Sequence, residues 1–268
     1  MKGGKIIPNN WDNWTLDNDT HILDNEYLNN TSLSGNLLIP NTVTSIGDWA
    51  FNGCTGLTSI TIPDSVTTIG QNAFDGCASL KRITLPTNSN FTSIGNSAFA
   101  KCSSLESVTI PISVITIGDN AFAKCSSLKS VTNPESVITI GDNAFSGCTE
   151  LKTVETFKKL KKIGMRAFGT CVNMDSFEFK EGLIEIDNMA FSSCGLKEIV
   201  IPNTIKRIGN SAFIKCKELS KVTFKHIDEQ ITIEGDAFSE CKDNFVIVNL
   251  PKKSILQKSS FPDNYKTE

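Results

Sequence analysis

The chain has 268 residues, of which 39% are hydrophobic and 21% charged, and its formal net charge is −3. These proportions are typical of a folded globular protein, and the small acidic excess excludes a general attraction to nucleic acid. The sequence has no run of about 18 apolar residues, so we expect no membrane insertion. Residues 1–10 contain no apolar signal segment, so we expect no secretory signal in that stretch.

The charge is unevenly distributed along the chain. Residues 1–150 hold 7 Lys+Arg and 13 Asp+Glu, whereas residues 151–268 hold 19 Lys+Arg and 16 Asp+Glu. The first part is therefore acidic, with a formal charge of −6, and the second part is basic, with a formal charge of +3.

Residues 1–35 differ from everything that follows. They are rich in Asn and Asp, and Trp11 and Trp14 are among their few large apolar side chains. The first coil of a repeat protein needs a segment that covers its open end. We therefore predict that residues 1–35 form an N-terminal cap with both tryptophans over the first coil. The alternative is a partly disordered tail.

From residue 36 to residue 251 a unit of about 23 residues recurs. Its clearest marker is a Phe followed three residues later by a Cys, a spacing that accounts for all nine cysteines. The marker residues are Phe51, Phe74, Phe99, Phe122, Phe145, Phe168, Phe191, Phe213 and Phe238. A period of about 20–29 residues is typical of a leucine-rich repeat, whose stacked units share one continuous core.

Each unit predicts three structural parts. Ile60 and Ile62 alternate with polar residues, which indicates a half-buried strand. A second extended segment follows at residues 66–69, and strands of successive units should stack in parallel. The segment Asp119-Asn120-Ala121-Phe122 predicts a short helical turn with Asp119 as its N-cap.

We therefore predict a repeat solenoid dominated by β-structure. It is a right-handed leucine-rich-repeat superhelix with a parallel β-sheet face and about nine coils of 23 residues. The solenoid spans residues 36–251. Residues 252–268, which include Ile255, Leu256, Phe261 and Tyr265, form a C-terminal cap.

The repeat pattern also carries a family resemblance. The segment from Ile62 to Leu80 reads Ile-Pro-x-x-Val-x-x-Ile-Gly-x-x-Ala-Phe-x-x-Cys-x-x-Leu, and it resembles the BspA-like (Treponema-type) leucine-rich repeats. The resemblance covers about four-fifths of the chain. It implies a cell-surface or secreted protein of a bacterium or protist, several of which are thought to act as adhesins. The family has no catalytic motif that could be carried over.

The nine cysteines lie at least 22 residues apart, one in each coil. Metal sites need closely spaced ligand pairs such as Cys-x₂-Cys, so we predict no metal site but a column of buried thiols that pack as small hydrophobic side chains. His21 and His226 adjoin no nucleophile pattern, and the glycines follow the repeat. We expect no catalytic residues, no cofactor and no enzyme activity.

The outward positions of the predicted strands form the candidate protein-binding face. This face is a row of hydroxyl side chains that becomes acidic in the middle coils. The row consists of Ser59, Thr61, Arg82, Thr84, Ser107, Thr109, Ser130, Thr132, Thr153, Glu155, Ser176, Glu178, Glu198 and Lys221. Repeat proteins commonly bind partners on such a face, whereas the alternative is that Thr simply suits an exposed strand. The face has few aromatic anchors, which favours a weak, polar or multivalent contact.

The second extended segment carries a local basic strip in the later coils. It contains Lys161, Lys162, Lys206 and Arg207, with Lys158 and Lys159 nearby. We interpret this strip either as a solvated face or as a contact for an acidic partner.

Two functions fit these observations. The first is a non-enzymatic protein-binding module, a surface or secreted adhesin-like protein that contacts host or matrix proteins through the sheet face. The alternative is an intracellular scaffold or delivered effector that uses the same face in the cytoplasm. In both cases the partner is a protein.

Overall fold

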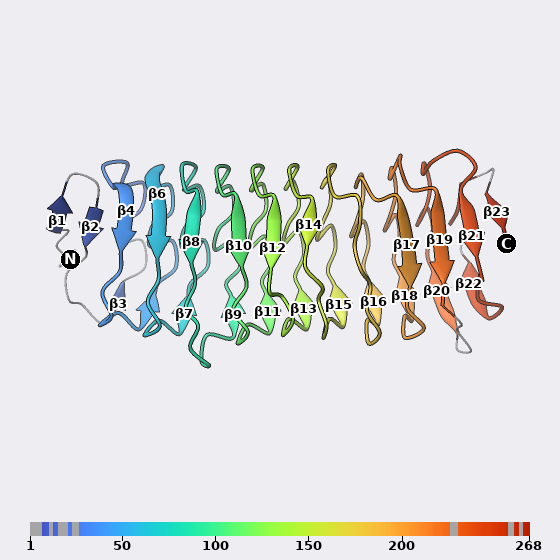
Figure 1. Ribbon diagram of the computed structural model, residues 1–268, viewed down its shortest axis with the longest axis horizontal. Coiled ribbons are helices and arrows are strands. Elements are labelled where there is room, and N and C mark those ends of the chain that lie inside the picture. Colours follow the sequence, from blue (N-terminus) through green and yellow to red (C-terminus); the bar gives the residue numbers. More distant parts are fainter. Residues whose placement is uncertain are drawn as a thin grey trace.

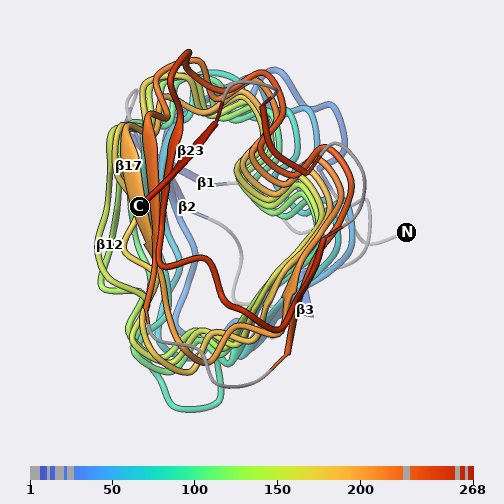
Figure 2. The same cartoon turned by 90° about the vertical axis from the view of Figure 1, so that its right-hand side faces the viewer.

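The computed structural model describes residues 7–10, 13–15, 21–22, 27–225, 230–256, 260–262 and 265–268. Within these residues the chain is a parallel-strand β-solenoid of about ten turns, about 23 residues apart, and no helix is formed (Figure 1). Viewed along the stack, the coils superimpose on a common outline (Figure 2). The predicted β-solenoid with a parallel sheet face is thereby confirmed.

One long side of the coils, which we call the sheet face, carries three consecutive sheets. All strand pairs in them are parallel except β1 with β2. The first sheet contains β1 (Ile7–Asn10), β2 (Asn13–Thr15), β4 (Ser34–Leu38), β6 (Gly56–Thr61) and β8 (Arg82–Thr84). The second contains β10 (Ser107–Thr109), β12 (Ser130–Thr132) and β14 (Thr153–Val154). The third contains β17 (Glu198–Ile201), β19 (Lys221–Phe224), β21 (Val246–Val248) and β23 (Lys266–Thr267).

The other extended side carries two parallel sheets of shorter strands. The first contains β3 (His21–Ile22), β5 (Ser45–Ile46) and β7 (Thr68–Ile69). The second contains β9 (Ser93–Ile94), β11 (Thr116–Ile117), β13 (Thr139–Ile140), β15 (Lys162–Ile163), β16 (Glu185–Ile186), β18 (Arg207–Ile208), β20 (Ile231–Ile233) and β22 (Ser254–Leu256). We call this side the second side.

The turn around each Phe is not helical, so that part of the prediction is wrong. Asn120 and Lys124 lie two residues before and after Phe122, and both are left-handed, with φ of 56° and 61°. Residues in this conformation cannot continue a right-handed helix. The N–H groups of Asn120, Phe122 and Lys124 donate to carbonyl oxygens of the next coil at 2.7, 2.8 and 2.7 Å. Bonds between coils therefore replace the bonds within a helix.

Asp119 bonds to the next coil instead of capping a helix. Its Oδ1 accepts a hydrogen bond from the Asp142 N–H at 2.8 Å, and Asp142 Oδ1 accepts one from the Met165 N–H at 2.8 Å. The Asp119 N–H donates to Asn96 Oδ1 at 2.9 Å. We call Asn96, Asp119 and Asp142 the Asx ladder. This ladder needs closely spaced coils, which leave little room for a side chain at position 118. A Cβ on Gly118 would lie only 2.6 Å from Asn96 Oδ1 and 2.8 Å from the Ile94 carbonyl oxygen.

The core is a continuous stack of aromatic rings. Eleven rings lie in parallel, and the centroids of neighbours are 5.0 to 5.6 Å apart. They are the nine marker phenylalanines with Tyr27 at one end and Phe261 at the other. Such offset stacking adds to the burial of apolar area, so each coil is stabilised mainly by its two neighbours.

Both terminal segments continue the strand pairing of the coils. β2 pairs in parallel with β4, and β22 and β23 pair in parallel with β20 and β21. Trp11, His226 and the side chain of Trp14 lie outside the described part of the chain. The covering role of the two tryptophans and the cap boundaries at residues 35 and 252 therefore stay predictions.

Candidate functional site

The structure places all fourteen predicted binding residues on the sheet face, and none of them is buried. Thr61, Arg82, Thr84, Ser107, Thr109, Thr153, Glu155, Ser176, Glu178 and Glu198 are exposed, and Ser59, Ser130, Thr132 and Lys221 are half-buried. They alternate with buried residues such as Ile60, Val108 and Val131 because side chains on a strand point to opposite faces. The rows can therefore be reached by a partner along the whole stack.

Equivalent residues of successive coils are aligned in register. Ser107 pairs with Ser130, which pairs with Thr153, while Thr109 pairs with Thr132. The two threonine Oγ1 atoms lie 3.0 Å apart and share a hydrogen bond. Across β10, β12 and β14 the rows therefore present hydroxyl groups at the strand spacing, about 4.8 Å apart.

The two central acidic residues of the face are held by contacts between coils. Glu155 Oε2 accepts a hydrogen bond from the Asn133 N–H at 2.6 Å, and Glu178 Oε2 accepts one from Thr156 Oγ1 at 2.6 Å. Glu178 also pairs with Lys180. Hydrogen bonds from Lys180 and from Thr156 hold the pKa of Glu178 below its ordinary value. Both carboxylates are therefore fixed in position before any partner arrives.

The rows are interrupted twice, which the repeat pattern does not predict. The inserted residues 87–90 lie between β8 and β9, where the sheets on both sides end. In the second interruption, Ser176 and Glu178 lie on the sheet face between β14 and β17, where that face has no described strand. The sheet face is thus divided into three blocks of aligned strands.

Additional phenylalanines fill the core at the second interruption. Asn133 takes the inward position of Ile62 and has a left-handed φ of 57°, which ends β12. Phe157 and Phe177 stack with centroids 6.0 Å apart, and Phe179 meets Phe177 at 4.8 Å. Phe177 and Phe179 replace aliphatic volume that a regular coil provides with Ile60 and Ile62, and Phe157 stands where the repeat has proline.

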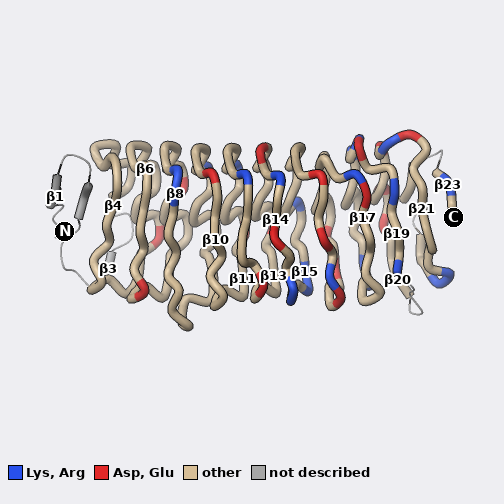
Figure 3. Tube along the Cα trace, viewed as in Figure 1, with Lys and Arg blue, Asp and Glu red and all other residues tan. Residues whose placement is uncertain are grey.

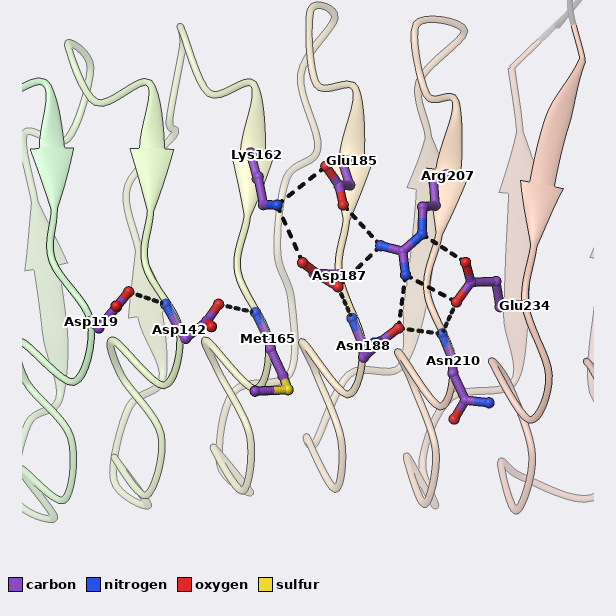
Figure 4. A network of polar contacts seen from close by, with 10 residues as sticks. All are labelled: Asp119, Asp142, Lys162, Met165, Glu185, Asp187, Asn188, Arg207, Asn210 and Glu234. Atoms are coloured by element: carbon purple, nitrogen blue, oxygen red, sulfur yellow. Dashed lines mark hydrogen bonds and ion pairs between the residues drawn. The ribbon is translucent and has the colours of Figure 1, made fainter.

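The predicted basic strip on the second side is largely neutralised. Lys162 lies 3.4 Å from Glu185 and 3.3 Å from Asp187. Arg207 contacts Glu185 at 2.8 Å, Asp187 at 3.0 Å and Glu234 at 2.7 Å (Figure 4). We call these five residues the charge cluster. The sequence does not reveal this cluster, because residues that pair across coils are between 20 and 27 positions apart along the chain.

Each partner in the charge cluster favours the ionised form of the other. The hydrogen bond to Glu234, followed by that to Asp187, raises the pKa of Arg207 above its ordinary value although burial opposes the shift. Burial alone would raise the pKa of Asp187, but the Asn188 N–H and the Arg207 guanidinium outweigh it and lower the pKa. These contacts favour the ionised forms of Asp187 and Arg207, and the cations of the cluster are occupied within the protein.

The nine cysteine thiols do more than fill space. Every Sγ contacts the carbonyl oxygen of the aromatic residue one coil earlier, at 2.9 to 3.3 Å. All nine are buried and free. Burial raises the pKa of Cys54 to about 11 and that of Cys125 to about 12. These thiols are thus weak hydrogen-bond donors rather than nucleophiles.

Neither a metal cluster nor a membrane-spanning helix is present in the part of the chain that the structure describes. No three described His, Cys, Asp or Glu side chains are grouped to hold a metal ion. No helix long and apolar enough to span a bilayer was found among the described residues.

The chain is similar to known repeat proteins along its whole length. The family model described as "BspA type Leucine rich repeat region" matches residues 20–152 and 138–268, in six copies. A leucine-rich repeat protein from Bacteroides ovatus is 22% identical, with a TM-score of 0.69, and the match covers 100% of this chain and 98% of that one. A leucine rich cell surface protein from Faecalibacterium prausnitzii is 24% identical, with a TM-score of 0.55 and coverage of 98% and 85%.

Two further solved structures share the fold. The T. pallidum leucine rich repeat protein is 28% identical, with a TM-score of 0.54, and the match covers 65% of this chain and 88% of that one. The pneumococcal vaccine antigen PcpA is 21% identical, with a TM-score of 0.59 and coverage of 92% and 71%. No curated protein matches the chain.

Proposed function

The chain belongs to the BspA-type leucine-rich repeat family, and from this premise we propose that it binds a partner protein through the sheet face. Leucine-rich repeats generally form protein-interaction modules, and they are typically scaffolds rather than enzymes. The observation that carries the proposal is the set of aligned, accessible side-chain rows on the sheet face, which are rich in hydroxyl groups in the first two blocks of strands.

The chemistry of the rows suits a polar protein surface. A hydroxyl both donates and accepts hydrogen bonds, so the rows can pair with amides and carboxylates of a partner. Glu155 and Glu178 add two fixed negative charges near the centre of the face. Without large aromatic anchors, each contact is weak, and affinity depends on the length of the face that is engaged.

We further propose that the chain acts at the cell surface or after secretion, as an adhesin-like protein. The F. prausnitzii neighbour is described as a cell surface protein, and PcpA is described as a vaccine antigen. Protease treatment and membrane-impermeant labelling of intact source cells test this location. Labelling from outside is the expected result, and protection would favour the intracellular scaffold instead.

Binding to a panel of extracellular-matrix proteins, measured by surface plasmon resonance, tests the face. We expect saturable binding that is lost in a Thr61→Arg/Thr84→Arg variant, because two arginines would obstruct the same row on two adjacent strands of the sheet face. A Thr68→Arg/Ser93→Arg variant is the matched control, since both residues are equally exposed but lie on the second side. Equal loss in both variants would contradict a site on the sheet face.

A further inference from the structure

The insertion at residues 87–90 divides the rod-shaped stack of coils into two bodies. Every described strand before it, up to β8, pairs only with strands that also precede it, and every described strand from β9 onward pairs only with strands that follow it (Figure 1). The inserted loop projects beyond the outline that the other coils share (Figure 2). We call the described residues up to 86 the first body, those from 91 onward the second body, and the boundary between them the junction.

The ladder of backbone hydrogen bonds on the second side stops at the junction. In the first body the Gly70 N–H donates to the Ile46 carbonyl oxygen at 2.9 Å, and in the second body the Gly118 N–H donates to the Ile94 carbonyl oxygen at 2.9 Å. Gly95 is the equivalent residue in the coil between them, yet within the described chain no hydrogen bond joins its N–H to the Ile69 carbonyl oxygen. Separation of the two bodies on this side would therefore break no bond of this ladder.

The sheet-face side is loosened at the junction as well. β8 and β10 are adjacent in the stack but belong to different sheets. Just before these strands the Glu106 N–H donates to the Lys81 carbonyl oxygen at 3.3 Å, whereas the equivalent bond from Lys129 to Glu106 in the second body measures 2.8 Å. The bond across the junction thus lies beyond the ordinary range of about 2.7–3.2 Å.

The Phe turns, in contrast, keep their contacts across the junction. The Phe74 N–H donates to the Ala98 carbonyl oxygen and the Gly76 N–H to the Ala100 carbonyl oxygen, both at 2.8 Å. The rings of Phe74 and Phe99 stack with centroids 5.3 Å apart, as in the regular coils. The two bodies are therefore joined firmly along one side of the coil, which is the arrangement of a hinge.

Buried polar atoms without a partner are found beside the junction. Within the described residues, three buried side-chain oxygen atoms lack a hydrogen-bond partner: Ser65 Oγ, Asp75 Oδ1 and Ser113 Oγ. They lie in the coils immediately before and after the coil that carries the insertion. Each such atom destabilises the closed arrangement, and chains open first where local stability is lowest.

The second interruption, between β14 and β17, lacks these properties. The second side continues past it, because β15 pairs with β16 and β16 pairs with β18. The charge cluster also joins these coils. At the junction the described residues provide one ion pair, Lys101 with Asp75 at 3.1 Å, and charged residues are sparse in the first body (Figure 3).

We propose that residues 87–90 form a hinge about which the first body tilts against the second. The two extended sides part at the junction, while the Phe turns stay bonded and serve as the axis. A few loop residues are enough to absorb such a motion. The tilt turns Thr61 and Thr84 relative to the rest of the sheet face, so the face adapts to a partner surface that is not straight. This last consequence rests on the proposed function, whereas the hinge itself does not.

The hinge is tested by double electron–electron resonance between nitroxide labels on engineered cysteines of the whole chain. The test pair, Thr61→Cys with Val200→Cys, spans the junction, and the control pair, Thr109→Cys with Val248→Cys, lies within the second body. Both pairs lie on sheet-face strands six coils apart, about 29 Å along the stack, and both cross the second interruption. The native thiols are buried and should stay unlabelled.

We expect a wider distance distribution for the test pair than for the control pair, with a tail toward other distances that the control lacks. Equal widths would overturn the hinge. This measurement needs no binding partner, so its failure is distinct from failure of the proposed function.

A deletion tests whether the insertion is the cause. Removal of Ser89 and Asn90 restores the regular spacing, because Phe74 and Phe99 are then 23 instead of 25 residues apart. The deletion retains Thr87 and Asn88, which bond to Asp64 at 2.6 Å and to the Val66 carbonyl oxygen at 2.8 Å. The excess width of the test pair should be lost in this variant. A folded deletion variant with an unchanged distribution would overturn the assignment of the hinge to residues 87–90.

Discussion

Two regions of the rod keep the same coil spacing by partly different means. In the coils from Asn96 to Met165, one side-chain oxygen per coil accepts the backbone N–H of the next coil. In the coils from Lys162 to Glu234, Asp187 and Glu234 take positions that are glycine elsewhere, and the charge cluster spans four coils. One bond of the ladder type persists there, from the Asn210 N–H to Asn188 Oδ1 at 2.9 Å. The ladder needs one small residue per coil, whereas the cluster needs five charged residues to be present together.

The difference shows how a repeat tolerates loss of its consensus. A Cβ on Gly164 would lie 2.7 Å from Asp142 Oδ1, so the ladder excludes larger residues at that column. Met165 occupies the position of Asp142 one coil later, but it has no carboxylate oxygen. The Cβ of Asp187, in the glycine column of the following coil, therefore meets no such oxygen. The new carboxylates are then stabilised by Lys162 and Arg207. The stability of the regular region, the coils from Asn96 to Met165, should therefore depend on packing. The stability of the irregular region, the coils from Lys162 to Glu234, should depend on charge.

The largest effect is expected from the ring stack in the regular region. Phe122 is fully buried and lies between rings 5.6 and 5.4 Å away, so Phe122→Ala should destabilise the protein by about 3–5 kcal/mol. The free energy of unfolding from urea denaturation measures this loss. Phe168→Ala is the matched variant of the irregular region, where Phe177 at 5.2 Å can relax into the cavity and reduce the loss. An unchanged unfolding curve for Phe122→Ala would contradict the proposed role of the stack.

A smaller loss is expected from removal of the central cation of the charge cluster. Arg207→Ala leaves three carboxylates without their guanidinium, and breaking a buried ion pair costs about 3–5 kcal/mol. These side chains are 19 to 29% exposed, so we expect about 2–3 kcal/mol, measured by the same denaturation. Lys197→Ala is the control, because Lys197 and Asp175 form an exposed pair whose loss should cost about 0.5 kcal/mol or less.

Acidification should reduce the difference between the natural chain and Arg207→Ala. The folded pKa of Asp187 is depressed, so its contribution is present above the ordinary pKa of 3.8 and is lost as the pH falls through the folded pKa. In the variant, protonation instead relieves repulsion among the remaining carboxylates. The unfolding free energies of the two proteins should therefore converge as the pH falls from neutral to below about 4. A constant gap across this range would show that Arg207 acts through packing.

The smallest effect is expected from a single bond of the Asx ladder. Asp142→Ala removes the acceptor of the Met165 N–H and should cost about 1 kcal/mol. Asp142→Asn should be nearly neutral, because Asn96 accepts the equivalent bond with its amide oxygen. Equal losses in both variants would mean that charge, and not the hydrogen bond, is needed at this position.

The sequence alone determined the repeat, the parallel sheet face and the outward rows, because a 23-residue period with two-residue alternation sets which side chains point inward. It also contained an unused signal for the stack ends, since Tyr27 and Phe261 lie 24 and 23 residues from the neighbouring marker phenylalanines.

Only the tertiary structure decided the left-handed Phe turns, the thiol hydrogen bonds and the pairing of the basic strip. The bonds of Asn120 and Cys125 and the ion pairs of Arg207 all join one coil to another. Local propensity in one unit favoured a capped helical turn and a free lysine-arginine row. The stacked neighbours overrode both preferences, because they offered carbonyls and carboxylates that no single unit contains.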